Sequence, residues 1–258
     1  MLLKRLRDVP KRGPRAVIVY CCVASISAAL VAQAAAVPSV QGTDLQSRDE
    51  VDGLTRLSPY LDVTWIERGI FSAELPNPAG RTFGTDWNFG IGKKLVITPS
   101  YYYFSFRTTS GAAGHVHSPI LAATPIFSRG RWTASDRNRF GGRFGTSGIG
   151  PSWAYRNRPR IDYRIGPSRW KTALFAWDEV FYFSKYSGFT RNRVAAGGRK
   201  EFTERLAADL YYQREDDERG TPARINTVGL QFEVRIRREA NPSEANMTGE
   251  PGIKNNIQ

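Results

Sequence analysis

Hydrophobic and polar side chains alternate with a period of two along most of the chain between residues 60 and 237. The segment Trp153–Ile165 shows the pattern most clearly. Its charged side chains all lie on one parity, at Arg156, Arg158, Arg160, Asp162 and Arg164. Successive side chains of a β-strand point to opposite faces, so one face of this segment is charged and the other is largely apolar. A soluble sheet exposes such a charged face to water and buries the apolar one. A membrane β-barrel turns the charged face toward its interior and the apolar face toward lipid.

About ten segments carry this alternation, and turn-forming residues such as Gly, Pro, Asn and Asp separate them. They are Tyr60–Arg68, Arg81–Gly92, Leu95–Arg107, Val116–Ser128, Arg131–Gly145, Trp153–Ile165, Trp170–Ser184, Arg191–Lys200, Arg205–Glu215 and Arg224–Arg237. Pro119 and Pro125 interrupt the fourth segment, which is therefore predicted to be an edge, a bulge or partly a loop. Pro159 predicts a bulge in the sixth segment.

The last two segments have the length that a tilted transmembrane strand needs, about ten residues. Leu206 and Leu210 alternate with polar residues in the first of them, and Leu230, Phe232 and Val234 do so in the second. Short turns and long loops both occur between the predicted segments, as in outer-membrane barrels.

The N-terminal region indicates export. In residues 1–36, basic residues precede an uncharged run, Ala16–Leu30, and small residues follow at Ala34 and Ala36, which is typical of a cleaved signal peptide. An uncleaved anchor helix is the alternative. Residues 37–58 are polar without periodicity and are expected to form a flexible leader. Residues 59–238 are expected to form the barrel domain and residues 239–258 a disordered tail.

Cysteine content, charge and hydropathy argue against disulfides, thiolate metal sites, nucleic-acid binding and further transmembrane helices. Cys21 and Cys22 are the only cysteines and lie in the predicted signal, so the exported chain has no disulfide and no thiolate metal ligand. The formal net charge is +13, but the arginines are spread singly through strands of an exported chain, which argues against nucleic acid. Apart from the signal, no hydrophobic run approaches the length of a transmembrane helix, so membrane insertion would require a closed barrel.

The sequence therefore predicts an all-β fold, an antiparallel up-and-down transmembrane β-barrel of about ten strands, within a range of roughly eight to twelve. Its expected location is the outer membrane. The expected partners are the lipid bilayer, lipopolysaccharide and the barrel-assembly machinery.

Four short motifs resemble a known bacterial family. They are Arg158–Arg164, Asp178–Phe181, Asn192–Val194 with Gly197, and Leu210–Gln213. In order and spacing they are similar to the domain-of-unknown-function family numbered 2490, over roughly residues 87–237. The resemblance implies a small outer-membrane barrel, and it implies no activity and no catalytic residues. The polar C-terminal tail, in place of a terminal aromatic strand, departs from the usual assembly signal.

Inward-facing charges are the candidate site. Glu179 is expected inside, paired with an arginine of a neighbouring strand, in a network centred on Glu179 and Arg160. The predicted lumen charge network comprises Arg139, Arg156, Arg158, Arg160, Asp162, Arg164, Glu179, Arg193, Asp209, Glu233 and Arg235. Arginines outnumber acids in it, which favours either a structural role or a narrow passage that attracts anions.

Catalysis is not expected, because the chain has no phosphate-binding loop, nucleophile elbow or metal-ligand run. Accordingly, no cofactor and no metal are predicted. His115 and His117 are the only histidines and are predicted to lie in a Gly-rich loop. Two alternatives stay open. One is an outer-membrane lipid-modifying hydrolase that uses His117, Ser118 and a carboxylate, and the other is a soluble periplasmic barrel that binds a ligand.

Overall fold

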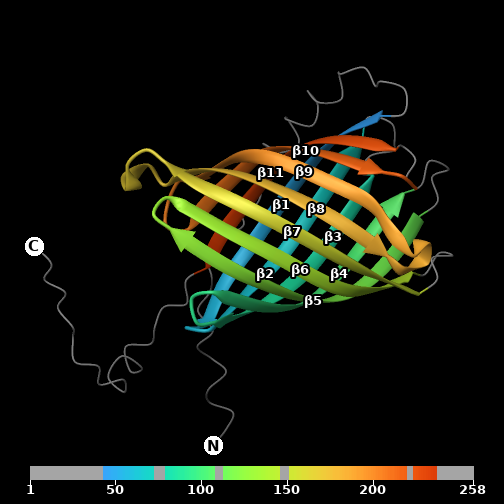
Figure 1. The fold of residues 1–258 in the computed structure, drawn as a ribbon, viewed down its shortest axis with the longest axis horizontal. Coiled ribbons are helices and arrows are strands. Elements are labelled where there is room, and N and C mark those ends of the chain that lie inside the picture. The colour runs from blue at the N-terminus through green and yellow to red at the C-terminus, as the bar shows by residue number, and fades with distance from the viewer. Residues whose placement is uncertain (1–42, 73–78, 108–112, 146–150, 220–222, 237–258) are drawn as a thin grey trace, which may run out of the picture.

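Eleven strands close into one barrel (Figure 1). The computed structural model describes residues 43–72, 79–107, 113–145, 151–219 and 223–236. The strands are β1 (Thr43–Ser58), β2 (Leu61–Ser72), β3 (Gly80–Ile91), β4 (Leu95–Arg107), β5 (Ala113–Arg129), β6 (Trp132–Gly145), β7 (Ser152–Ile165), β8 (Thr172–Phe183), β9 (Gly188–Glu201), β10 (Leu206–Asp217) and β11 (Arg224–Ile236). The all-β barrel predicted from the sequence is confirmed, and its strand number lies within the predicted range.

Consecutive strands pair antiparallel all the way round, and β1 closes the barrel by pairing with β11. This last pair is parallel, with Thr43 opposite Arg224 and Thr55 opposite Ile236. Alternating strand directions force such a seam, because the first and the last of an odd number of strands run the same way. Single-chain bacterial outer-membrane barrels have an even number of strands, so the seam departs from the expected all-antiparallel pattern.

Strand β1 corrects the prediction of a flexible leader over residues 37–58. Residues 43–58 pair with β2 on one side and with β11 on the other. Both faces of this strand carry charge, since Glu50 and Asp52 lie on one parity and Asp49 lies on the other. A strand with polar residues on both faces has no apolar alternation to reveal it. The predicted signal, residues 37–42 of the leader and the tail at 239–258 lie outside the described residues.

The prolines sit inside continuous strands and interrupt one hydrogen-bonding ladder each. Pro119 and Pro125 belong to β5, which pairs with β4 at both positions but lacks partners in β6 there. Pro159 pairs with Asp136 of β6 and has no partner in β8, and the β7–β8 register is the same on both sides of it. Proline lacks an N–H, so each one gives up a single ladder bond without the predicted bulge or loop.

Glycines make room for two inward tyrosines. A Cβ on Gly84 would come within 2.5 Å of the Tyr102 ring, and a Cβ on Gly229 would come within 2.0 Å of the Tyr211 ring. In both cases the aromatic ring lies next to the glycine that it faces on the adjacent strand, where any larger residue would displace it. These contacts hold two rings against the inner wall.

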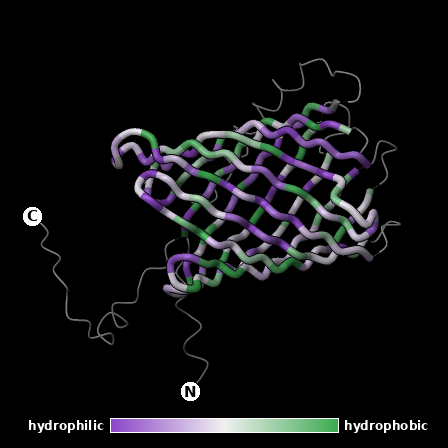
Figure 2. Tube along the Cα trace, in the orientation of Figure 1, coloured by the Kyte–Doolittle hydropathy of each residue, from purple (hydrophilic) through white to green (hydrophobic). Residues whose placement is uncertain are grey.

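The two faces of the barrel differ in polarity. Hydrophobic and hydrophilic residues alternate along the strands in Figure 2. Large apolar side chains are exposed on the outside, for example Trp65 at 59% and Leu210 at 58%, whereas many of the buried side chains are polar or charged. In the described part of the chain, no helix is long and apolar enough to cross a membrane.

Candidate functional site

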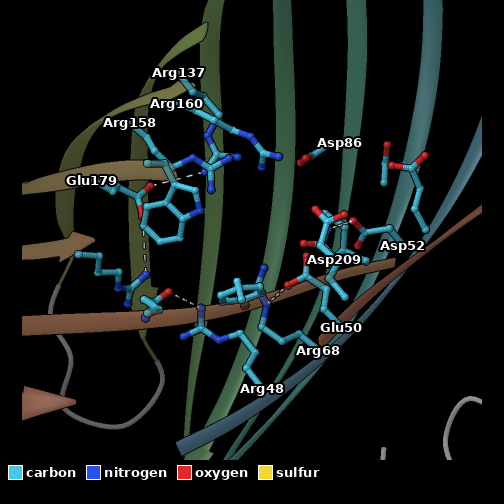
Figure 3. Close-up of a pocket in the computed structure, with 18 of the residues that line it drawn as sticks. Arg48, Glu50, Asp52, Arg68, Asp86, Arg137, Arg158, Arg160, Glu179 and Asp209 are labelled. Carbon is cyan, nitrogen blue, oxygen red and sulfur yellow. Dashed lines mark hydrogen bonds and ion pairs between the residues drawn. The ribbon is translucent and has the colours of Figure 1, made fainter. Parts of the chain in front are cut away.

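A cavity of about 300 Å³ lies inside the barrel, and all eleven strands contribute to its lining (Figure 3). Nine arginines and six carboxylates face it. The arginines are Arg48, Arg68, Arg137, Arg139, Arg156, Arg158, Arg160, Arg193 and Arg199, and the acids are Glu50, Asp52, Asp86, Glu179, Asp209 and Glu233. The alternation that makes each strand two-faced brings these charges together from segments that lie far apart in the sequence.

Most of the predicted charge network lines this cavity. Its lining members are Arg139, Arg156, Arg158, Arg160, Glu179, Arg193, Asp209 and Glu233. The other three lie beyond the cavity. Asp162 binds Arg160 at 2.7 Å and Arg235 binds Glu233 at 2.7 Å, so both contact lining residues. Arg164 donates to the backbone carbonyl of Gly130 in the turn between β5 and β6.

The predicted network lacks the charged residues that β1 contributes to the cavity. Arg48, Glu50 and Asp52 line the cavity from the strand that was predicted to be a leader. Their spacing of two residues was the available signal, because charges at every second position share one face of a strand. The predicted network also lacks Arg68 and Asp86, which line the cavity and fall within the predicted strands Tyr60–Arg68 and Arg81–Gly92.

Glu179 is 4% exposed and lies among arginines. Its carboxylate is 3.5 Å from Arg137 Nη2 and 3.8 Å from Arg193 Nη1. Glu179 of β8 is opposite Arg193 of β9, so one of its two arginine partners lies on a neighbouring strand.

The predicted centre at Glu179 and Arg160 is wrong. Arg160 forms three hydrogen bonds of 2.7–3.0 Å with Asp162. The register explains this difference, because Arg160 lies opposite Trp177 rather than Glu179.

An aromatic row on the inner face of β8 supports the arginines of β7. The guanidinium of Arg160 is 4.2 Å from the Phe175 ring centroid, that of Arg158 is 5.4 Å from Trp177, and that of Arg156 is 4.9 Å from Phe181. Stacking covers one face of a guanidinium and leaves its N–H edges available. Among the described residues, Arg139, Arg156 and Arg158 have no carboxylate oxygen within 4.0 Å.

On the acidic side of the cavity most carboxylates are already paired. Arg68 binds Glu50, and Arg199 binds Asp209 at 3.1 Å and Glu233 at 2.8 Å. Figure 3 shows Asp52 and Asp209 on the opposite side of the cavity from Arg137 and Arg158. The lining is therefore polarised, with a surplus of arginine on one side and the acids concentrated on the other.

The histidines lie in β5, and the prediction of a Gly-rich loop there is wrong. Both side chains point outward, where His117 Nδ1 is 2.5 Å from the Tyr101 hydroxyl and His115 Nδ1 is 2.6 Å from the Tyr103 hydroxyl. Ser118 is buried and donates to the Gly142 carbonyl at 2.8 Å. Because His117 and Ser118 are consecutive in a strand, they point to opposite faces and cannot act as a catalytic pair.

Three solved structures are similar to the chain in fold. The first is described as a bacterial polysaccharide outer membrane secretin, with 10% identity and a TM-score of 0.46 over 68% of this chain and 64% of that one. The NanC porin has 7% identity and a TM-score of 0.48 over 75% and 99%. The anion-selective porin from Comamonas acidovorans has 11% identity and a TM-score of 0.37 over 70% and 54%. The chain thus spans less than two thirds of the secretin and of the Comamonas porin.

Among curated proteins no sequence matches the chain. A family model does match residues 82–226, from β3 into β11. This stretch includes the arginines of β6 and β7, the aromatic row of β8 and all four motifs that carry the resemblance. Since the match extends over more than half of the sequence, the chain belongs to the family described as protein of unknown function DUF2490.

Proposed function

We propose that this protein is an integral outer-membrane β-barrel without catalytic activity, and that its arginine-rich lumen forms a narrow passage that favours anions. The observation that carries the proposal is the polarity of the two faces. Large apolar side chains point outward while nine arginines and six carboxylates face an internal cavity. A soluble barrel of this size would bury its apolar face and expose its charges, which is the reverse arrangement.

Outward aromatic rings support insertion into a membrane. They gather in two rows near opposite ends of β6 to β9. Trp132 and Tyr163 form one row, with ring centroids 4.5 Å apart. The other row comprises Phe140, Trp153, Tyr182 and Phe189, with neighbouring centroids 5.2–5.4 Å apart. Membrane barrels carry aromatic girdles at both interfaces with water, and the positions of these rows near opposite strand ends match such girdles.

Polar side chains on the outer face between these rows satisfy one another. Asn157 donates to Asp136 at 2.6 Å and to Asn138 at 3.1 Å. Farther round the barrel, Asn192 donates to Asp178 at 2.6 Å. Polar atoms in hydrocarbon are tolerated where the protein itself supplies their hydrogen-bond partners, so this patch is compatible with a lipid-facing surface.

The lining favours anions because its positive charge is in excess and part of it is unpaired. Arg139, Arg156 and Arg158 have no ion pair with another described residue, and Glu179, which lines the same cavity, is shared by Arg137 and Arg193. Charges in a narrow, partly dehydrated channel act more strongly than they would in water. A permeating anion would therefore be attracted to this wall, and a cation would be repelled by it.

Ion selectivity in planar lipid bilayers tests the proposal. We expect purified protein to require detergent for extraction and to give a current whose reversal potential in a KCl gradient shows chloride preference. Arg156→Gln and Arg158→Gln should each reduce that preference. Arg214→Gln is the matched control, because Arg214 lies on the outer face at a strand end and pairs with Asp216. A cation-preferring current, or extraction without detergent, would contradict the proposal.

A further inference from the structure

We propose that the barrel cavity binds a small zwitterion, with the anionic group on the unpaired arginines of β6 and β7 and the cationic group at Asp52. This inference rests on the proposed passage and names the class of solute that it would take. It follows from two sets of charges that face the same cavity and have no ion-pair partner.

The anionic group would be held by Arg139 and Arg158. Arg139 is 8% exposed, and its Nε lies buried without a hydrogen-bond acceptor, as does the Nε of Arg158. Burying an N–H donor without a hydrogen-bond acceptor costs free energy. An oxygen anion that accepts a hydrogen bond from either Nε–H would remove that cost. Guanidinium edges match carboxylate and phosphate oxygens geometrically, and the stacking of Arg158 on Trp177 fixes its plane.

The cationic group would be held by Asp52. This side chain is 8% exposed and accepts one hydrogen bond, from Gln231 at 2.6 Å. Its other oxygen, Oδ1, is buried without a partner. No cation of the described chain lies within 4.0 Å of Asp52, although Arg68 binds the adjacent inward acid, Glu50. A buried carboxylate that the protein leaves without a cation is suited to an ammonium group brought by a ligand.

The separation of these charges selects a ligand that carries both. Asp52 lies across the cavity from Arg158 in Figure 3, so these two unpaired groups do not neutralise one another directly. A simple anion would satisfy the arginines and leave Asp52 unpaired, and a simple cation would do the reverse. A zwitterion bridges both sides, and a cavity of about 300 Å³ is at the lower end of the size range for small-molecule sites.

Intrinsic fluorescence provides the test, because Trp177 lines the cavity. The detergent-solubilised barrel would be titrated at constant ionic strength with 4-aminobutyrate, 6-aminohexanoate, butyrate and butylammonium. We expect at least one zwitterion to bind saturably with a Kd at least tenfold lower than that of butyrate or butylammonium. Trp177→Phe should abolish the fluorescence change.

Two variants separate the two ends of the site. Asp52→Asn should remove the tenfold advantage of the zwitterion without weakening butyrate binding, because it removes a negative charge from the cavity. Arg158→Gln should weaken both the zwitterion and butyrate. Asp62→Asn is the matched control, because Asp62 lies outside the cavity and pairs with Arg56.

Titration of the wild-type protein tests zwitterion binding even if a variant does not insert. Equal affinity for butyrate and the zwitterions, or no binding of any probe, would overturn the inference. That result would leave chloride preference in bilayers, and hence the proposed passage, intact. Conversely, zwitterion binding by a protein that carries no anion-selective current would overturn the passage and leave the site.

Discussion

At the scale of single residues, Glu179 is the carboxylate on which the arginine side of the cavity depends. Glu179→Ala would leave Arg137 without a carboxylate partner among the described residues, whereas Arg193 keeps Glu215, and removal of one partner of a buried pair typically costs about 3–5 kcal/mol. Arg160→Ala should cost less, because its partner Asp162 has 23% of its side chain exposed and can be hydrated. Denaturant unfolding in lipid vesicles measures both. A Glu179→Gln barrel, which keeps the volume, separates charge from packing, and equal losses for Glu179→Ala and Arg160→Ala would contradict the ranking.

Glu179 and Arg193 show which features of single residues can be predicted from the sequence and which cannot. The parity of Glu179 and Arg193 in their strands places both inside, and this much follows from alternation alone. Which arginine Glu179 meets depends on the register between β8 and its neighbours, and a shift of two residues keeps the same faces while changing every partner. No apolar alternation marks the strand of Asp52, which is polar on both faces, so the spacing of Arg48, Glu50 and Asp52 at every second residue is the one signal for its position.

At the scale of elements, β11 offers a direct test of which face meets lipid. Leu230 lies on the outer parity, whereas its neighbour Gln231 lines the cavity. Leu230→Arg should cost about 2–4 kcal/mol if this position is near the bilayer midplane, and should impair insertion. Gln231→Arg should be far milder, since the new cation would face Asp52, which Gln231 now contacts. The folded fraction after refolding into vesicles reports both, and similar losses at the two positions would refute the assignment of faces.

The strands that sequence reasoning found are those with one apolar face. Leu95–Arg107 was predicted with its observed bounds, and most others were predicted within a few residues. The exceptions have physical causes. Strand β1 lacks an apolar face. Strand β5 continues through two prolines because each proline interrupts the hydrogen bonding to only one neighbouring strand. The histidines lie next to glycines, a pattern typical of a loop, but the backbone of this segment pairs with β4 at Ser105 and Tyr103.

At the scale of the whole molecule, export remains a prediction from the first 36 residues. The basic start, the uncharged run and the small residues at Ala34 and Ala36 predict cleavage close to these alanines. Intact mass of the protein recovered from the outer membrane measures this directly. The exported chain should lack Cys21 and Cys22 and therefore should not react with a thiol reagent, and a thiol-reactive product of full mass would show an uncleaved anchor instead.

Because β1 and β11 pair in parallel, the barrel wall begins at one rim and ends at the other. Because Thr43 and Arg224 lie at one rim and Ile236 lies at the other, the chain enters the barrel wall at one mouth and leaves it at the opposite mouth. An even number of strands would return both ends to the same side. Epitope tags placed directly before Thr43 and directly after Ile236 should therefore never be reached by the same antibody applied to one side of a sealed membrane. In the proposed membrane-spanning barrel, Thr43 and Ile236 would then face different compartments, so a single chain would present one end of its barrel wall to each side of the membrane.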